Sequence, residues 1–318
     1  MKYPSGNIPK MALVQQQLSR EKIEDVRTMV RDKLLAGGLR ERVKTGAQVG
    51  ITAGSRGMGG FMELIGGTID ALRAVGASPF ILPSMGSHGG ASAEGQVELL
   101  GKFGITEKNL GVPIRSTMET DCLGTSDTGA KVHLDRNAAN CDGVIVLGRV
   151  KTHPENTEGI ASGLLKMTTI GLGKQSGAQE AHSHGLWDSV KAVPKITFQS
   201  QKILFGIAVA ENAFREPVKI EVVPGTYEAF YDADTRLLKI SKKHFARVPF
   251  DSLDLLIVDE LGKNISGTGM DLNVIGPWRI KGGEKHPDYK RIVVLSLTEQ
   301  SMGNGLGIGL SDFTTERF

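Results

Sequence analysis

The spacing of apolar residues over the first hundred positions predicts a helix followed by two strand–turn–helix units. The first helix is expected at 19–35, where Ser19 is the candidate N-cap and two glycines follow the last apolar position. In the two units we expect strands at 49–53 and 79–82 and helices at 61–75 and 92–103. A strand, a glycine-rich turn and a helix that recur about every 30 residues are typical of a parallel sheet with right-handed crossovers.

Apolar runs in the rest of the chain predict more strands and a second unit. A glycine-rich turn that enters a helix is expected at 159–170, and residues 249–251 resemble a linker. The pattern predicts an α/β protein with two α/β domains, at 1–249 and 250–318, with mainly parallel sheets and a cleft between them. The further strands are expected at 143–147, 203–210, 218–223, 246–250, 255–260 and 291–297.

The final stretch of the chain has the composition of a helix start. Residues 311–316 begin with a serine that could cap a helix and contain early acidic residues. Because a helix of two turns is marginally stable by itself, we expect the second domain to continue beyond Phe318.

Composition narrows the class of protein. Hydrophobic residues make up 40% of the 318 positions, and 41 glycines suit an α/β protein with many tight turns. The net charge of +3 and the aromatic content of 5% argue against a nucleic-acid-binding protein. No segment has the roughly 20 apolar residues of a membrane span, none resembles a secretory signal, and the two cysteines have no CxxC spacing. We therefore expect a cytoplasmic protein with reduced, mostly buried cysteines.

Two turns at the predicted carboxyl edge of the sheet carry candidate binding residues, and open α/β sheets bind ligands at this edge. Arg56 follows the first strand and could form paired hydrogen bonds with a carboxylate or phosphate. A solvated surface arginine is equally compatible with its spacing. His88 follows the second strand and lies between Gly86 and Gly89, which favours a position in a pocket.

The segment 150–184 concentrates candidate catalytic groups, with three histidines, three lysines and five glycines. His153 follows the strand predicted at 143–147. Lys166 lies among leucines and methionine, so it is either a surface lysine with an apolar contact along its stem or an amine held in an apolar pocket as a nucleophile or attachment point. His182 and His184 are two positions apart, and in an extended segment both would lie on one side as a candidate metal pair.

Five motifs, in this order, resemble the nickel-dependent lactate racemase family, and in particular its broader branch of 2-hydroxyacid racemases and epimerases. The motifs are GSRG, MGSHGGASAEGQ, RVKTHPENTEGIASGLLKM, IGLGKQSGAQEAH and DELGKNISGTGMDLNV, and the resemblance extends over nearly the whole chain. The resemblance implies a two-domain α/β isomerase that binds nickel as a nickel-pincer nucleotide, nickel pyridinium-3,5-bisthiocarboxylic acid mononucleotide. It also implies that cofactor-synthesis proteins are partners.

The resemblance further implies which residues hold the cofactor. Lys166 matches the lysine that can be joined to a thioacyl arm of the nucleotide. His182 matches the histidine that ligates nickel, and His184 is the alternative ligand. Further cofactor contacts are expected from Ser55, Gly86, Gly89 and Gly163.

Three residues match the family's catalytic positions. His88 and His153 match the acid and base on the two faces of the substrate, and Arg56 matches the arginine that binds the substrate carboxylate. In the implied reaction, hydride leaves the 2-hydroxyacid carbon for the pyridinium ring and returns to the opposite face. Histidines suit the accompanying proton transfers because each can act as base in one direction and acid in the other.

Two other functions remain open on the residues alone. A metal-dependent hydrolase could use His88, His153 and His182 around zinc, although no HExxH-like spacing is present. A non-catalytic protein could bind anions or carbohydrates in its glycine-rich turns. A small-molecule partner is expected in each case, and a homo-oligomer is compatible with the sequence.

Overall fold

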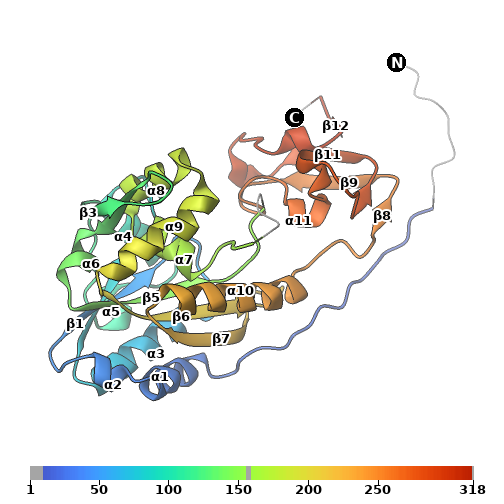
Figure 1. Cartoon of the computed structure of the whole chain (residues 1–318). Coiled ribbons are helices and arrows are strands. Elements are labelled where there is room, and N and C mark those ends of the chain that lie inside the picture. The colour runs from blue at the N-terminus through green and yellow to red at the C-terminus, as the bar shows by residue number, and fades with distance from the viewer. Residues whose placement is uncertain (1–9, 155–158, 317–318) are drawn as a thin grey trace.

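A five-stranded sheet forms the centre of the larger part of the molecule, as Figure 1 shows. The structure is a computed structural model, and it describes residues 10–154 and 159–316. The strand order is β2-β1-β5-β6-β7, and all neighbours are parallel except β6 and β7. The mainly parallel α/β fold expected from the sequence is confirmed. The strand bounds are β1 Gln48–Ala53, β2 Ser78–Pro83, β5 Gly143–Arg149, β6 Ile203–Glu211 and β7 Pro217–Pro224.

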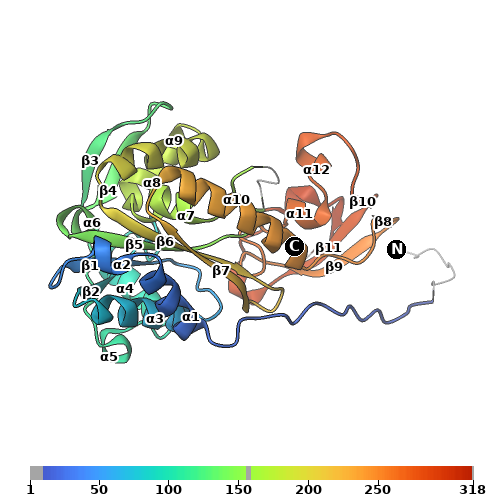
Figure 2. The same cartoon turned by 60° about the horizontal axis from the view of Figure 1, so that its bottom comes forward.

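Helices cover both faces of this sheet (Figure 2). On one face lie α1 Val26–Ala36, α2 Leu39–Arg42, α3 Phe61–Ala74, α4 Ala93–Gly101 and α5 Glu107–Leu110. On the other lie α6 Arg136–Asn140, α7 Leu164–Lys166, the π-helical turn η1 Met167–Gly171, α8 Lys174–Ser183, α9 Leu186–Gln199 and α10 Tyr227–His244. Each group of helices encloses its own apolar cluster against the sheet.

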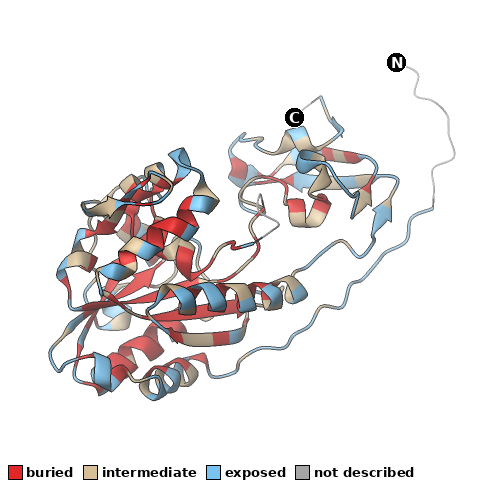
Figure 3. Cartoon of the chain, viewed as in Figure 1, coloured by how far each residue is buried: buried red, intermediate tan, exposed pale blue. Residues whose placement is uncertain are grey.

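Strand β5 explains why the sheet needs cover on both faces. Ile145 and Leu147 belong to the cluster on the α1–α3 side, whereas Val144 and Val146 belong to the cluster on the α9–α10 side. All four side chains are fully buried, and the central strands are accordingly red in Figure 3. An unbroken apolar run is typical of a parallel strand that is buried on both faces, because successive side chains point to opposite sides.

Some elements were not expected from the apolar pattern. The long helix α10 has only a narrow buried stripe, and its other positions are exposed or half-buried and mostly polar. An antiparallel hairpin, β3 Thr120–Thr125 with β4 Lys131–Asp135, lies outside the main sheet. Cys122 on β3 is exposed, so the expectation of buried cysteines is wrong there, whereas Cys141 is buried.

The C-terminal residues form a second, smaller unit with its own apolar cluster. Its parallel sheet has the order β12-β11-β9, and a short pair of strands, β8 and β10, lies beside it. The division of the chain at residue 249 remains a prediction. The bounds are β8 Ser252–Leu253, β9 Leu256–Leu261, α11 Leu272–Ile275, α12 Trp278–Lys281, β10 Asp288–Tyr289, β11 Ile292–Leu297, η2 Glu299–Ser301, η3 Ile308–Leu310 and β12 Phe313–Thr314.

Three local predictions are wrong. The first helix begins later than expected, and its N-cap is Asp25, whose carboxylate accepts a hydrogen bond from the Thr28 N–H at 2.9 Å. Residues 246–250 form no strand. Residues 311–316 begin no helix, because β12 pairs with β11 instead.

Asp312 accounts for the strand at this end of the chain. Its carboxylate accepts a hydrogen bond from the Ile292 N–H at 2.7 Å, and its own N–H donates to the Ile292 carbonyl at 2.8 Å. The hydroxyl of Ser311 donates to the Ile308 carbonyl at 2.7 Å, so it is not available as a helix cap. Tertiary pairing therefore replaces the local helix signal.

No helix within the described residues is both long and apolar enough to cross a bilayer.

Helices α1 and α3 approach each other closely at a glycine. A Cβ atom added to Gly67 would lie 2.3 Å from the Arg27 carbonyl oxygen, so only glycine fits there without moving the backbone. Beside this contact, the Arg27 guanidinium forms two hydrogen bonds with the Asp70 carboxylate, at 2.6 and 2.9 Å. The pair of helices therefore depends on Gly67 for its spacing.

We expect Gly67→Ala to lower the free energy of unfolding by about 1–3 kcal/mol, because the added methyl group pushes α1 away from α3. Gly101→Ala is the matched control, since Gly101 is also helical and has no atom within 4 Å of an added Cβ. The control should be neutral or stabilising by up to about 1 kcal/mol. Urea denaturation of both variants measures the difference, and equal values would contradict this account of the packing.

Candidate active site

A cavity of about 280 Å³ lies at the carboxyl edge of the central sheet. Three of its walls are the turns that follow β1, β2 and β5, which meet there because these strands are parallel neighbours. The start of α7 and the turn η1 form another wall. Gly267 and Thr268 of the C-terminal unit complete the lining.

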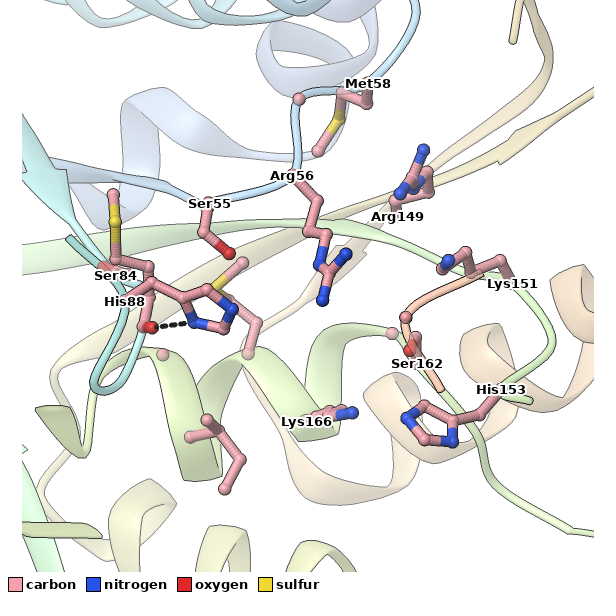
Figure 4. A pocket seen from close by; sticks show the side chains of 18 of the residues that line it. Ser55, Arg56, Met58, Ser84, His88, Arg149, Lys151, His153, Ser162 and Lys166 are labelled. Carbon is pink, nitrogen blue, oxygen red and sulfur yellow. Dashed lines mark hydrogen bonds between the residues drawn. The ribbon is translucent and has the colours of Figure 1, made fainter. Parts of the chain in front are cut away.

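Most of the predicted site residues line this cavity. Figure 4 shows Ser55, Arg56, His88, His153 and Lys166 around it, although they come from four separate segments of the chain. Gly163 also contributes to the lining. Gly86 and Gly89 belong to the turn that carries His88 but are not among the residues that line the cavity.

The turn after β2 holds the His88 ring in a defined orientation. The ring nitrogen Nδ1 lies 2.9 Å from the Met85 carbonyl oxygen, and because that oxygen can only accept, Nδ1 carries a hydrogen and donates it. In Figure 4 the second ring nitrogen faces the cavity. Gly89 has a φ of +69°, and a Cβ there would lie 2.7 Å from the backbone of Gly95 and Gln96, so the turn packs onto the start of α4.

Hydrogen bonds from a buried polar cluster also hold the turn that carries His88. The amide of Gln96 donates to the carbonyls of Gly86 and His88, at 2.9 and 3.3 Å. Its oxygen accepts from Lys174 Nζ at 2.6 Å, and this fully buried ammonium also donates to the Pro83 carbonyl at 2.7 Å.

The Asp135 carboxylate lies 3.4 Å from Lys174 and balances its charge. Burial is the main cause that lowers the pKa of Lys174 and raises the pKa of Asp135, whereas their mutual attraction opposes both changes.

A second buried carboxylate fixes the helix that carries Lys166. Asp234 on α10 accepts hydrogen bonds from the N–H groups of Leu164 and Leu165, at 2.8 and 3.0 Å. Gly163, at the N-cap, has no side chain that could accept these hydrogen bonds, so Asp234 caps the helix from α10 instead. A larger residue would not fit at Gly163, because an added Cβ would lie 2.3 Å from the Asp234 carboxylate oxygen. Burial raises the pKa of Asp234 to about 7, and the two N–H donors partly offset this effect.

Trp187 of α9 packs against two of the candidate catalytic side chains. The centres of the His153 and Trp187 rings are 4.9 Å apart, and Lys166 Nζ lies 5.0 Å from the centre of the Trp187 ring. Burial, followed by the charges of Lys166, Lys151 and other nearby groups, lowers the pKa of His153 to about 3. The imidazole of His153 is therefore neutral at physiological pH.

Positive charge dominates the cavity. Its lining includes Arg56, Arg149, Lys151 and Lys166, and no Asp or Glu is found among the described residues that line it. Arg149 is balanced from outside this lining by Glu211, at 3.1 Å. Such an arrangement favours an anionic ligand.

The C-terminal unit is tied to this site by hydrogen bonds to two backbone carbonyls. The Asn273 amide donates to the His153 carbonyl at 2.9 Å, and the Leu272 N–H donates to the Pro154 carbonyl at 3.1 Å. Gly267 lies against Arg56, because a Cβ there would be 3.2 Å from the guanidinium. The smaller unit therefore positions both His153 and Arg56.

The predicted metal residues do not lie in the cavity lining. His182 is on helix α8 rather than on an extended segment, so it does not share a side with His184, which follows the helix at its C-cap. Both are exposed, and His184 Nδ1 lies 3.0 Å from the Glu180 carbonyl. His182 is close enough for its charge to contribute to the lowered pKa of His153. Within residues 10–154 and 159–316, no three His, Cys, Asp or Glu side chains form a group that could hold a metal ion.

Several residues of the site were not singled out from the sequence. Arg149 and Lys151 follow the same predicted strand as His153, so the rule that ligands bind at carboxyl ends of strands could have found them. Gln96, Lys174 and Asp234 act through tertiary contacts between distant segments, and no local signal marks them.

The fold and the site together define the class of protein: an α/β protein with a cation-lined pocket at the carboxyl edge of a mainly parallel sheet. A model of the family described as the lactate racemase N-terminal domain matches residues 14–193, more than half of the chain. The chain therefore belongs to this family, and membership supports a racemase-type function. No curated protein matches the chain.

Solved structures agree with the fold. A protein from Thermotoga maritima, solved as a structural genomics target, has 13% sequence identity and a TM-score of 0.56, with 86% of this chain and 70% of that chain covered. The lactate racemase apoprotein from Thermoanaerobacterium thermosaccharolyticum has 13% identity and a TM-score of 0.52, with 87% and 68% covered. At this identity the similarity establishes the fold alone.

Removal of the Asp234 carboxylate should weaken the fold around Lys166. We expect Asp234→Ala to lower the free energy of unfolding by about 2–5 kcal/mol, because two buried N–H groups lose their acceptor. Asp232→Ala on the same helix is the control, since Asp232 is exposed and should change stability by less than about 0.5 kcal/mol. Thermal and urea denaturation compare the two variants, and similar losses would argue against a capping role for Asp234.

The His153 ring should remain neutral from pH 5 to pH 8. A base whose pKa is lowered to about 3 stays unprotonated above that pH, whereas an unperturbed histidine titrates near 6.5. NMR spectra of protein with ¹³C-labelled histidine measure this directly, and His153→Gln identifies the signal. A titration midpoint of His153 between about pH 6 and 7 would show that the ring is solvated rather than buried among cations.

Proposed function

We propose that the protein is an isomerase that racemises or epimerises a 2-hydroxyacid. The observation that carries this proposal is the meeting of two imidazoles, a guanidinium and an amine around one cation-lined cavity in a chain of the lactate racemase family. An anionic substrate of a few carbon atoms fits both the charge and the volume of about 280 Å³.

Arg56 is the proposed carboxylate-binding residue. Figure 4 places its guanidinium in the middle of the cavity, between His88 and His153. A guanidinium can hold a carboxylate through two parallel hydrogen bonds, which would fix the acid while its other end changes configuration. The contact with Gly267 limits where the guanidinium can move.

The two histidines are the proposed acid–base pair. They lie on different sides of the cavity in Figure 4, so each could reach the hydroxyl group of one enantiomer. A neutral imidazole can accept the hydroxyl proton as the carbinol is oxidised, and the protonated ring can return a proton in the reverse direction. The low pKa of His153 favours its role as the base that is already unprotonated at neutral pH.

The implied cofactor agrees with the donor chemistry of the pocket. Lys166 offers an amine for attachment, and the surrounding cations suit the phosphate of a mononucleotide. According to the resemblance, the nucleotide brings three of the four nickel donors itself, so a cluster of three protein ligands is not required. When bound, the nickel-pincer nucleotide would supply a hydride acceptor for the substrate carbon. His182 is our proposed fourth donor, with His184 as the alternative, because the charge of His182 acts on His153 beside the cavity.

A zinc hydrolase is less well supported. His88 and His153 lie on different sides of the cavity, and His182 lies outside its lining. Three such ligands would have to converge on one ion at about 2.0–2.1 Å from each nitrogen.

The decisive experiment is co-expression with the cofactor-synthesis proteins that we propose as partners. Intact mass and nickel content of the purified protein report cofactor loading, and D- and L-2-hydroxyacids of increasing length are then tested for racemisation by chiral chromatography. Loading together with racemisation supports the proposal. Loaded protein that leaves every enantiomer unchanged would instead favour a protein that binds anions without catalysis.

Lys166→Ala should remove both the cofactor-derived mass increment and the racemase activity, because the attachment point is lost. Lys191→Ala on α9 is the control, since Lys191 is exposed and its nearest acidic partner, Asp188, is 3.9 Å away. The control should load and turn over like the wild type. A loaded and fully active Lys166→Ala variant would rule out the proposed attachment.

A further inference from the structure

Lys151 occupies the junction of two cavities. It follows β5 directly and lines both the site described above and a second cavity of about 260 Å³ next to it. Arg56 and Arg149 line both cavities as well. In Figure 4 the Lys151 amine points inward, towards Arg56. This lysine is therefore open to a ligand from either cavity.

The charges around Lys151 are mostly positive. Arg56, Arg149 and Lys166 act on its ammonium group, and among the described residues Asp271, at the start of α11, opposes them. Within the described part of the chain, no acceptor lies at hydrogen-bond or ion-pair distance from Lys151 Nζ. The other charged or titratable residues around the two cavities are His88, His153, Glu211, Arg215, His244 and Lys263.

This environment disfavours the charged form of the lysine. Burial is the largest cause, followed by repulsion from Arg149 and Arg56, and together they lower the pKa of Lys151 to about 8. Compared with an ordinary lysine of pKa about 10.4, roughly 200-fold more of its amine is unprotonated at pH 7. The unprotonated amine is the form that attacks carbonyl groups.

Lys166 lies in the same cavity but in a different environment. Its ammonium group is 5.0 Å from the centre of the Trp187 ring, and the face of an indole stabilises a positive charge. The two lysines therefore differ in their surroundings: Lys166 packs on an aromatic ring, whereas burial and two arginines act on Lys151.

We propose that Lys151 is a carbonyl-reactive amine that forms a reversible imine with small 2-oxoacids. Arg56, towards which Lys151 points, would bind the carboxylate, and this places the adjacent carbonyl carbon beside Nζ. The nitrogen lone pair adds to that carbon, and the carbonyl oxygen takes up a proton to give a carbinolamine. The carbinolamine then loses its hydroxyl group from carbon and a proton from nitrogen as one molecule of water, which gives the imine.

This site goes beyond the proposed racemase activity and requires neither nickel nor nucleotide. A racemase that passes through an oxidised substrate would nevertheless expose Lys151 to such an oxoacid. Trapping with the cofactor-free protein therefore tests the imine alone, and its outcome does not depend on the outcome of the racemase experiment.

The test is reductive trapping. Purified cofactor-free protein is incubated with pyruvate and sodium cyanoborohydride, which fixes an imine as a secondary amine, and peptide mass mapping locates the adduct. We expect modification at Lys151 roughly 200-fold faster at pH 7 than at the exposed Lys191. Acetone serves as the neutral carbonyl control and should react roughly 10-fold to 100-fold more slowly than pyruvate, because Arg56 cannot hold it.

Two variants make the assignment specific. Lys151→Arg should abolish the cavity adduct while the circular dichroism spectrum remains that of the wild type, and Lys166→Arg should keep the adduct. The rate at Lys151 should rise with pH and level off above about pH 8, where the amine is mostly unprotonated. Adducts spread evenly over surface lysines, an adduct at Lys166 instead, or equal rates with acetone and pyruvate would overturn the proposal.

Discussion

The parallel pairing of β1, β2 and β5 is the constraint on which the rest of the site depends. Parallel neighbours end at the same edge, so the turns that carry Arg56, His88 and His153 must meet there although they are far apart in sequence. Apolar side chains on both faces of β5 hold the sheet between two layers of helices. The backbone arrangement therefore brings the proposed catalytic side chains together before their own chemistry can act.

Buried polar contacts fix the positions of the segments that carry the side chains of the site. Asp234 caps the helix of Lys166 from another helix, and the Lys174–Gln96 contact holds the turn of His88. Both contacts bury an ionisable group, Asp234 or Lys174, and such burial costs free energy unless the hydrogen-bond partners of the group are in place. Both contacts tie a segment of the site to a distant part of the chain, so the site and the surrounding fold stabilise each other.

The excess of positive charge among the described residues that line the cavity has two consequences. It attracts an anionic ligand, and it adds to the effect of burial, which is the main cause that lowers the pKa values of His153 and Lys151. The attraction for an anion and the lowered pKa values of His153 and Lys151 therefore come from one electrostatic arrangement. The C-terminal unit takes part in it, because Asp271 and Gly267 approach Lys151 and Arg56.

The sequence by itself determined the strand–turn–helix units of the main sheet and the presence of Arg56, His88 and His153 at its carboxyl edge, because apolar runs and glycine turns are local signals. It misplaced the first N-cap, and only tertiary pairing with β11 decided that residues 313–314 form a strand rather than a helix. Helical geometry of α8 likewise separated His182 from His184, against the extended segment expected. The roles of Asp234, Gln96 and Lys174, and the lowered pKa of Lys151, could not be predicted, because each depends on burial and on groups brought together from distant parts of the chain.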